Sequence, residues 1–152
     1  MNTLFVVLHV LAAVLFLGPV TVAISTFHVR AYEAHKGNES AKGAAKNLLR
    51  ISQTYGVLSL LAPLFGFALM FTDDHWSEGK YHASILLAVI AWALLFFVIL
   101  PRQRAIAAAL GIAEATDKAP TDLDWDKSKS QLSMFGGIFS LLWVVVLILM
   151  LI

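Results

Sequence analysis

Residues 132–152 read LSMFGGIFSLLWVVVLILMLI, a stretch without Asp, Glu, Lys or Arg. An α-helix rises about 1.5 Å per residue, so this stretch is long enough to cross the roughly 30 Å hydrocarbon core of a bilayer. Three further uncharged apolar runs occupy residues 4–24, 55–71 and 83–100. The sequence therefore predicts an all-α fold, in which residues 1–152 form one integral membrane domain built as a four-transmembrane-helix bundle.

The composition leaves no room for a separate soluble domain. The chain of 152 residues is 59% hydrophobic and 14% charged, against about 25% charged residues in soluble proteins. The polar segments are each shorter than about 35 residues, whereas domains seldom contain fewer than about 50. There is no cysteine, which excludes disulfides, thiolate metal sites and thiol catalysis.

The basic residues are distributed asymmetrically along the chain. Ten of the eleven Lys and Arg residues lie in residues 25–54 and 101–131, and only Lys80 lies between the second and third runs. Because cytoplasmic loops carry the Lys and Arg excess, these two segments are predicted to be cytoplasmic and both termini extracytoplasmic. No basic residue precedes the first run, so residues 4–24 are interpreted as a retained span rather than a signal peptide.

The polar segments favour helices that continue beyond the apolar runs on the cytoplasmic side. Residues 25–36 contain neither Pro nor Gly, and Gly37 with Asn38 is typical of a turn. Good helix formers follow from about Ser40 into the second run, and again over residues 105–115. The cytoplasmic segments are therefore expected to be largely helical.

Proline and aspartate mark irregular points in this pattern. Pro19 and Pro63 lie inside the first and second runs, where each removes a backbone donor and is expected to kink its helix.

Asp122, Asp124 and Asp126 stand two residues apart but lack the glycine and glutamate of an EF-hand loop. They are interpreted as a solvated acidic loop that either caps the fourth helix or contacts a basic partner.

His9 is the candidate cofactor-binding residue. It lies inside the first run, where an ionisable side chain is costly and is by default a functional candidate. A neutral imidazole can ligate haem iron or copper, while the structural alternative is one hydrogen bond to a neighbouring helix. His75 and His82 lie near the same leaflet and would extend this site only if the fold brings them to His9.

Two further histidines, His28 and His35, are seven residues apart on one helical face. With Arg30 and Glu33 nearby, they are interpreted as part of a solvated face.

Small residues predict where helices approach each other closely, because helix association in membranes depends on such positions. The candidate packing residues are Gly56, Ser59, Ala62 and Gly66 on the second helix and Gly136 and Ser140 on the fourth. The same pattern fits packing within the bundle or packing against another protein. Trp92 and Trp143 lie in mid-span, where packing is the usual role of tryptophan and a lipid or a flat cofactor ring are the alternatives.

The sequence contains no complete set of catalytic residues. It has no phosphate-binding loop, no H-E-x-x-H zinc motif and no G-x-S-x-G nucleophile turn. A transporter normally places polar or charged groups at the bilayer midplane, whereas here the mid-span polar residues are hydroxyls such as those of Ser59 and Ser140. A pump or carrier acting alone is therefore disfavoured.

One part of the first run resembles a known family. The residues that carry the resemblance are Leu8-His9-Val10-Leu11-Ala12-Ala13 and Leu17-Gly18-Pro19. They look like a family of uncharacterised bacterial four-helix integral membrane proteins, distantly similar to copper-resistance D-type and haem-binding protoporphyrinogen-oxidase-type membrane proteins. The resemblance implies the bacterial plasma membrane, and it places His9 at the position of a haem or metal ligand. Some members also look like accessory subunits of the actinobacterial cytochrome bcc–oxidase supercomplex.

Two functional hypotheses follow. In the first, the chain is a non-catalytic accessory or assembly subunit of a respiratory membrane complex, with the lipid bilayer and other membrane subunits as partners. It then binds no cofactor by itself and no nucleic acid. In the second, it is a haem- or metal-binding membrane oxidoreductase, or a copper-handling protein, that uses His9.

Overall fold

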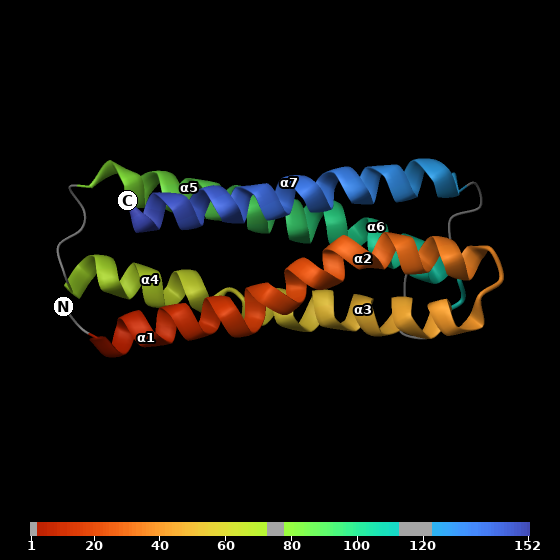
Figure 1. Ribbon diagram of the computed structural model, residues 1–152, viewed down its shortest axis with the longest axis horizontal. Coiled ribbons are helices and arrows are strands. Elements are labelled where there is room, and N and C mark those ends of the chain that lie inside the picture. Colours follow the sequence, from red (N-terminus) through yellow and green to blue (C-terminus); the bar gives the residue numbers. More distant parts are fainter. Residues whose placement is uncertain (1–2, 73–77, 113–122) are drawn as a thin grey trace.

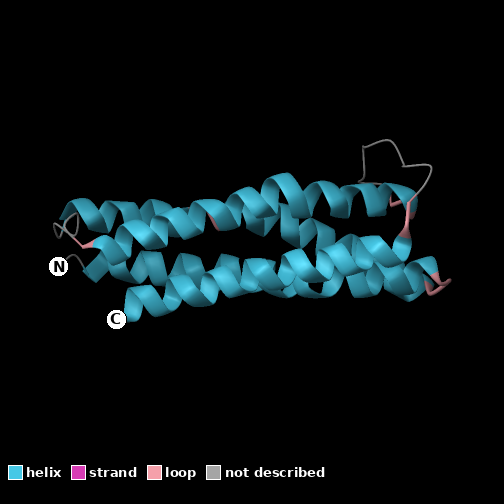
Figure 2. Cartoon of the chain, turned by 90° about the horizontal axis from the view of Figure 1, so that it is seen from above, coloured by secondary structure: helices cyan, strands magenta, loops and turns pink. Residues whose placement is uncertain are grey.

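The computed structural model describes residues 3–72, 78–112 and 123–152. Apart from short turns, this part of the chain is helical and contains no strand (Figure 2). The helical elements, in order, are α1 (Thr3–Ala12), the π-helix η1 (Ala13–Leu17), α2 (Gly18–His35), α3 (Glu39–Leu58), α4 (Leu61–Thr72), α5 (Gly79–Leu94), the π-helix η3 (Leu95–Ile99), α6 (Leu100–Ala109) and α7 (Trp125–Leu151). The predicted all-α fold is confirmed.

These elements join into four helices that are long and apolar enough to cross a membrane, namely Thr3–His35, Glu39–Phe71, Gly79–Ala109 and Trp125–Leu151. Length and composition thus indicate a multi-pass membrane protein. The first two helices contain 33 residues each, which corresponds to about 50 Å. They exceed a hydrocarbon core of about 30 Å, so these helices continue well past their apolar runs, as the sequence predicts.

The bundle is elongated and has two different ends (Figure 1). At one end, here called the terminal end, α1 begins and α7 finishes, and at the opposite end, the basic end, the turn after α2 lies near the start of α7. Toward the terminal end α1 packs on α4 and α5 packs on α7, whereas at the basic end α2 contacts α3, α6 and α7, and α3 contacts α6. The four helices are therefore more fully packed together at the basic end.

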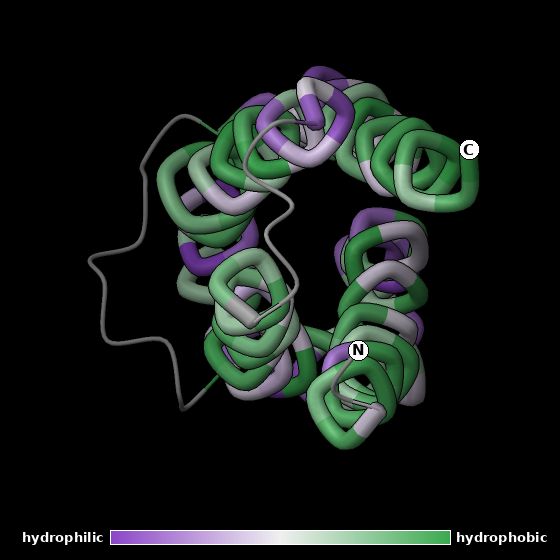
Figure 3. Tube along the Cα trace, turned by 90° about the vertical axis from the view of Figure 1, so that its left-hand side faces the viewer, coloured by the Kyte–Doolittle hydropathy of each residue, from purple (hydrophilic) through white to green (hydrophobic). Residues whose placement is uncertain are grey.

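The outer surface of the bundle is apolar over the predicted spans. Viewed from the terminal end, hydrophobic positions appear around all four helices (Figure 3). Many large apolar side chains point outward, among them Val14 and Leu86, which are 65% and 61% exposed. Such a surface is compatible with lipid and not with water, because soluble monomers rarely expose extended apolar patches.

Glycine ends two of the helices at the basic end. Gly37 and Gly111 both have positive φ, 105° and 75°, a conformation that costs glycine nothing. After α6, the amide of Gly111 donates to the Ala108 carbonyl and that of Ile112 to the Ala107 carbonyl, which is the Schellman pattern of helix termination. The helix predicted over residues 105–115 was therefore too long, because it ends before Gly111, and residues 113–122 lie outside the described part.

The prolines act on the helices in two ways. Pro19 and Pro101 each follow a π-helix, η1 and η3, in which the wider turn accommodates the missing amide and the ring of a proline inside a continuing helix. At Pro63 the helix is interrupted instead, since α3 ends at Leu58 and α4 starts at Leu61. The sequence predicted kinks at Pro19 and Pro63, and the structure has a π-helix before Pro19 and an interruption of the helix before Pro63.

Small residues form most of the buried face of α3, which packs on α2 and, at Gly56, on the third helix. The buried positions of α3 are Ala41, Ala45, Leu49, Ser52 and Gly56. Their spacing of four or three residues forms one stripe along the helix. A stripe dominated by small side chains allows close approach of the two backbones, which gives the basic end of the bundle its core.

Candidate functional site

His9 lies between the first and second helices of the bundle. Its Nδ1 atom is 2.6 Å from the carbonyl oxygen of Ala62, and since a carbonyl only accepts hydrogen bonds, Nδ1 is the donor. The opposite wall is Gly66, where an added Cβ would lie 2.9 Å from Cε1 of the imidazole. The glycine thus provides the space that the ring occupies.

The interruption of the second helix lies immediately beside this contact. Pro63 has no amide proton to donate to the Ser59 carbonyl, which instead accepts from the amide of Ala62 at 3.2 Å. The Ala62 carbonyl that meets His9 therefore belongs to the first turn after the break. His9 thus links the first helix to the second directly beside this interruption.

Ser59 links the second helix to the third. Its hydroxyl donates to the Gly56 carbonyl at 2.6 Å and accepts from Nε1 of Trp92 at 3.0 Å. Trp92 in turn packs edge-on against Trp143 of α7, with ring centroids 4.7 Å apart. Both tryptophans thus take the packing role: the buried hydroxyl joins the second and third helices, and the ring contact joins the third helix to the fourth.

The other candidate packing residues occupy close approaches or partly buried positions. A Cβ on Gly136 would lie 3.1 Å from Cγ2 of Ile24 on α2, and one on Gly56 would lie 3.2 Å from Cδ2 of Leu95. Ser140 is half-buried on α7. Gly136 therefore lies where α7 meets α2, and Gly56 lies where α3 meets the third helix.

The hydrogen bond of His9 engages one ring nitrogen, so Nε2 is the atom that would hold a haem iron or a metal ion. Metal-binding histidines usually donate one ring N–H to a carbonyl or carboxylate, which orients the ring and leaves the other nitrogen for the metal. The Nδ1 bond to Ala62 has this form and leaves Nε2 as the coordinating atom. A metal ion held by several side chains fits less well, because no group of three potential ligands is found among the described residues. His82 is exposed at the start of α5, and His75 lies outside the described part.

The interpretation of His28 and His35 as a solvated face was wrong for His28. The start of α7 packs against α2 there, so His28 is only 9% exposed. His35 is exposed, yet its ring stacks on Trp125 with centroids 4.0 Å apart. The predicted cap is present beside them, since the Asp124 carboxylate accepts from the amide of Lys127, while Asp122 lies outside the described residues.

The contact between α2 and α7 also contains polar residues that the sequence analysis did not single out. The Tyr32 hydroxyl donates to Oδ1 of Asp126 at 2.7 Å, and Nζ of Lys129 lies 4.5 Å from the centre of the Tyr32 ring. The available signal was the continuation of α2 past its apolar run, which places His28, Tyr32 and His35 within one stripe. A stripe of three ring side chains outside the membrane core favours a helix contact over a solvated face.

Three comparisons with known proteins find no match for this chain. They comprise a scan against models of protein families and searches of curated proteins and of solved structures. The resemblance of the first run to a family of bacterial four-helix membrane proteins therefore stays a prediction.

Proposed function

We propose that this chain is a non-catalytic accessory or assembly subunit of a larger membrane complex. Its polar mid-span groups, His9, Ser59 and Trp92, are engaged in contacts between its own helices. Such contacts stabilise a bundle and leave few groups for chemistry. A helix bundle of this kind packs between other membrane subunits and holds them together.

The observation that carries the proposal is the uncovered face of the first helix. Of the four candidate spans it is the least buried by the rest of the chain, at 11% of its apolar window against 39% for the third. An exposed stripe, here called the outer seam, runs along it and consists of Leu4, Val7, Leu11, Val14, Gly18, Val22, Ser25 and Val29. Its members are three or four residues apart, the spacing with which one helix packs along another.

The residue at the centre of the outer seam, Gly18, has no side chain. A Cβ placed on Gly18 would meet no atom within 4 Å, so a helix of another subunit has open access to the backbone there. Small residues at such a position allow the close approach on which association in membranes depends. Lipid also covers apolar faces, and co-purification distinguishes a bound subunit from lipid.

The proposed setting is the bacterial plasma membrane, with both termini extracytoplasmic and the basic end in the cytoplasm. Nine of the ten basic residues assigned to the cytoplasm belong to the described residues, and Lys118 does not. A respiratory supercomplex is the proposed partner, on the strength of the family resemblance alone.

The test is co-purification after gentle solubilisation of the native membranes. Mass spectrometry is expected to find membrane subunits, including those of a respiratory complex, in fixed stoichiometry with this chain. Val14→Trp in the outer seam should abolish that association, whereas the matched substitution Leu86→Trp on the exposed face of α5 should not. Recovery of the parent protein only as a monomer would overturn the proposal.

A second candidate function is supported by the orientation of His9. With Nδ1 bonded to Ala62, Nε2 is the atom that would hold a haem iron in a membrane oxidoreductase, and a bound haem would supply one-electron chemistry. The protein's own contribution is to fix the imidazole through Ala62 and Gly66. Absorbance in the Soret region of the purified protein tests this directly, since a stable, colourless preparation from haem-replete cells excludes it.

A further inference from the structure

A groove lies between α2 and α7 at the basic end of the bundle. It has a volume of about 490 Å³ and is lined by His28 of α2 and by Asp126, Lys129, Ser130, Ser133 and Met134 of α7. The uncharged run of the fourth helix begins at Leu132. The groove therefore spans the boundary of that run, with its charged groups on the polar side and Met134 on the apolar side.

The groove contains one charge of each sign. Nζ of Lys129 lies over the Tyr32 ring, and no ion pair joins it to a carboxylate of the described residues. Asp126 accepts the Tyr32 hydroxyl through Oδ1, which leaves its second oxygen as an acceptor. The cation and the carboxylate are thus each able to bind a group of opposite charge.

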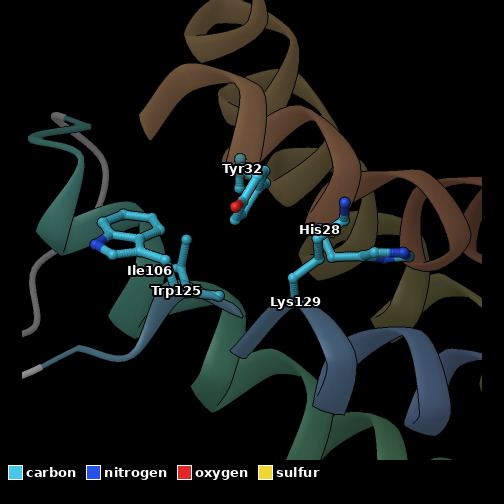
Figure 4. A pocket seen from close by; sticks show the side chains of 6 residues that line it. His28, Tyr32, Ile106, Trp125 and Lys129 are labelled. Atoms are coloured by element: carbon cyan, nitrogen blue, oxygen red, sulfur yellow. The ribbon is translucent and has the colours of Figure 1, made fainter. Parts of the chain in front are cut away.

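A buried histidine lies at the same place. His28 is 9% exposed and lines the groove, and the Ile24 carbonyl of the preceding turn is the backbone group that faces its ring. Figure 4 shows Lys129 extending from α7 toward Tyr32 and His28 of α2. These three side chains also line an adjoining cavity of about 10 Å³ (Figure 4). His28 therefore forms the α2 side of the groove.

The apolar side of the groove continues along α7. Met134, Ile138 and Leu141 are 52%, 42% and 61% exposed, and their spacing of four and three residues puts them on one helical face. This stripe leads from the groove along the uncharged run. It offers a hydrocarbon chain a path that begins directly at the charged groups.

We propose that this groove binds a phospholipid whose headgroup carries a phosphate and a primary ammonium, as in phosphatidylethanolamine. The phosphate contacts Lys129 and the hydroxyls of Ser130 and Ser133, and the ammonium contacts Asp126. An acyl chain lies along Met134 and Ile138. A purely anionic headgroup fits less well, because it would place its charge near Asp126, whereas anionic lipids are normally bound by clusters of several Lys and Arg residues.

The test uses the purified full-length protein in mixed micelles with equal amounts of three dioleoyl phospholipids, with ethanolamine, choline or glycerol headgroups. Native mass spectrometry reports the lipid that stays bound. We expect the ethanolamine lipid to exceed each of the others by about fivefold or more, since choline cannot donate a hydrogen bond to Asp126 and glycerol does not offset its charge. Equal retention of the three lipids would overturn the proposal.

Four variants separate the contacts. Lys129→Gln should lower retention of the ethanolamine lipid about fivefold, the usual effect of one basic residue at a membrane surface, and Ser133→Leu should lower it by filling the groove. Asp126→Asn keeps an acceptor for Tyr32 and should shift the preference toward the glycerol lipid. The control is Lys127→Gln on the same helix but outside the groove, which should change nothing. An equal loss in Lys127→Gln and Lys129→Gln would show general surface attraction and contradict a specific site.

A final arm distinguishes the lipid from its soluble headgroup. Free phosphoethanolamine should fail to displace the bound lipid at concentrations at which added phosphatidylethanolamine does so. Displacement by both to the same extent would show that the groove recognises the headgroup without the chains and would overturn the lipid assignment. Thermal unfolding of each variant, compared with the parent, confirms that every protein tested is folded.

Discussion

The His9 imidazole fits within the first apolar run because of two residues on the second helix, Ala62 and Gly66. The Ala62 carbonyl accepts a hydrogen bond from Nδ1, so this nitrogen is not left unpaired among apolar side chains. Gly66 leaves the ring its space. The sequence identified both His9 and Gly66, but only their contact explains why they occur together.

The hydrogen bond of His9 leads to a prediction for His9→Gln. Glutamine retains a donor of similar reach, and interhelical hydrogen bonds in membranes contribute only about 0.6 kcal/mol on average. The variant is therefore expected to insert, to unfold at nearly the parent temperature and to keep its partner subunits. A haem or metal signal present in the parent and absent in His9→Gln would instead favour the oxidoreductase.

Gly66→Ala should be more harmful than His9→Gln. The new Cβ would lie 2.9 Å from Cε1 and 3.0 Å from Nδ1 of His9, and overpacking of this kind costs about 1–3 kcal/mol. Thermal unfolding in detergent measures the loss, and His9→Ala in the same chain should relieve most of it. The matched control is Gly137→Ala, where the Cβ meets no atom within 4 Å. Equal destabilisation by both alanines would show that helix flexibility, not the His9 contact, is responsible.

At the scale of the elements, three prolines that each lie inside a long helix have different outcomes. Before Pro19 and Pro101 the helix widens into a π-turn and continues, while before Pro63 it is interrupted. The sequence predicts an irregularity at a proline because the ring removes a donor and clashes with the preceding turn. Which form the irregularity takes depends on the side chains packed around it, such as His9 and Trp92 at the break before Pro63.

The start of α7 allows a test of one local interaction. Asp124 precedes the helix and accepts from the amide of Lys127 at 3.0 Å, and loss of such a cap costs about 1 kcal/mol. Asp124→Ala should therefore speed amide hydrogen exchange in the first turn of α7, while Asp124→Asn, which keeps the acceptor, should leave it slow. Unchanged exchange in Asp124→Ala would mean that packing of Trp125 on the bundle fixes this turn.

At the scale of the whole molecule, the proposed topology depends on the distribution of charge along the sequence. Because the two segments rich in Lys and Arg are expected in the cytoplasm, a reporter enzyme fused after Ile152 should be active outside it. The control is the same reporter placed after Gly37, at the turn between α2 and α3, which should be active in the cytoplasm. The reverse pair of results would invert the orientation.

The sequence by itself determined the four apolar helices, their approximate limits and the turn at Gly37, and it predicted a helix cap within the acidic stretch that contains Asp124. Each depends on a local property, namely the length of an uncharged run, glycine's access to positive φ or the hydrogen bond of one carboxylate. These properties act over a few residues or along a single helix, so they remain visible in one dimension.

Only the tertiary structure decided which helix faces meet. The pairing of His9 with Ala62 spans 53 residues and that of Tyr32 with Asp126 spans 94. Periodicity alone could not distinguish a solvated face around His28 from a face covered by α7, since both place the same residues on one side of α2. The physical reason is that a long helix fixes the direction of its side chains but not its neighbours, which here depend on how four helices pack beyond their apolar runs.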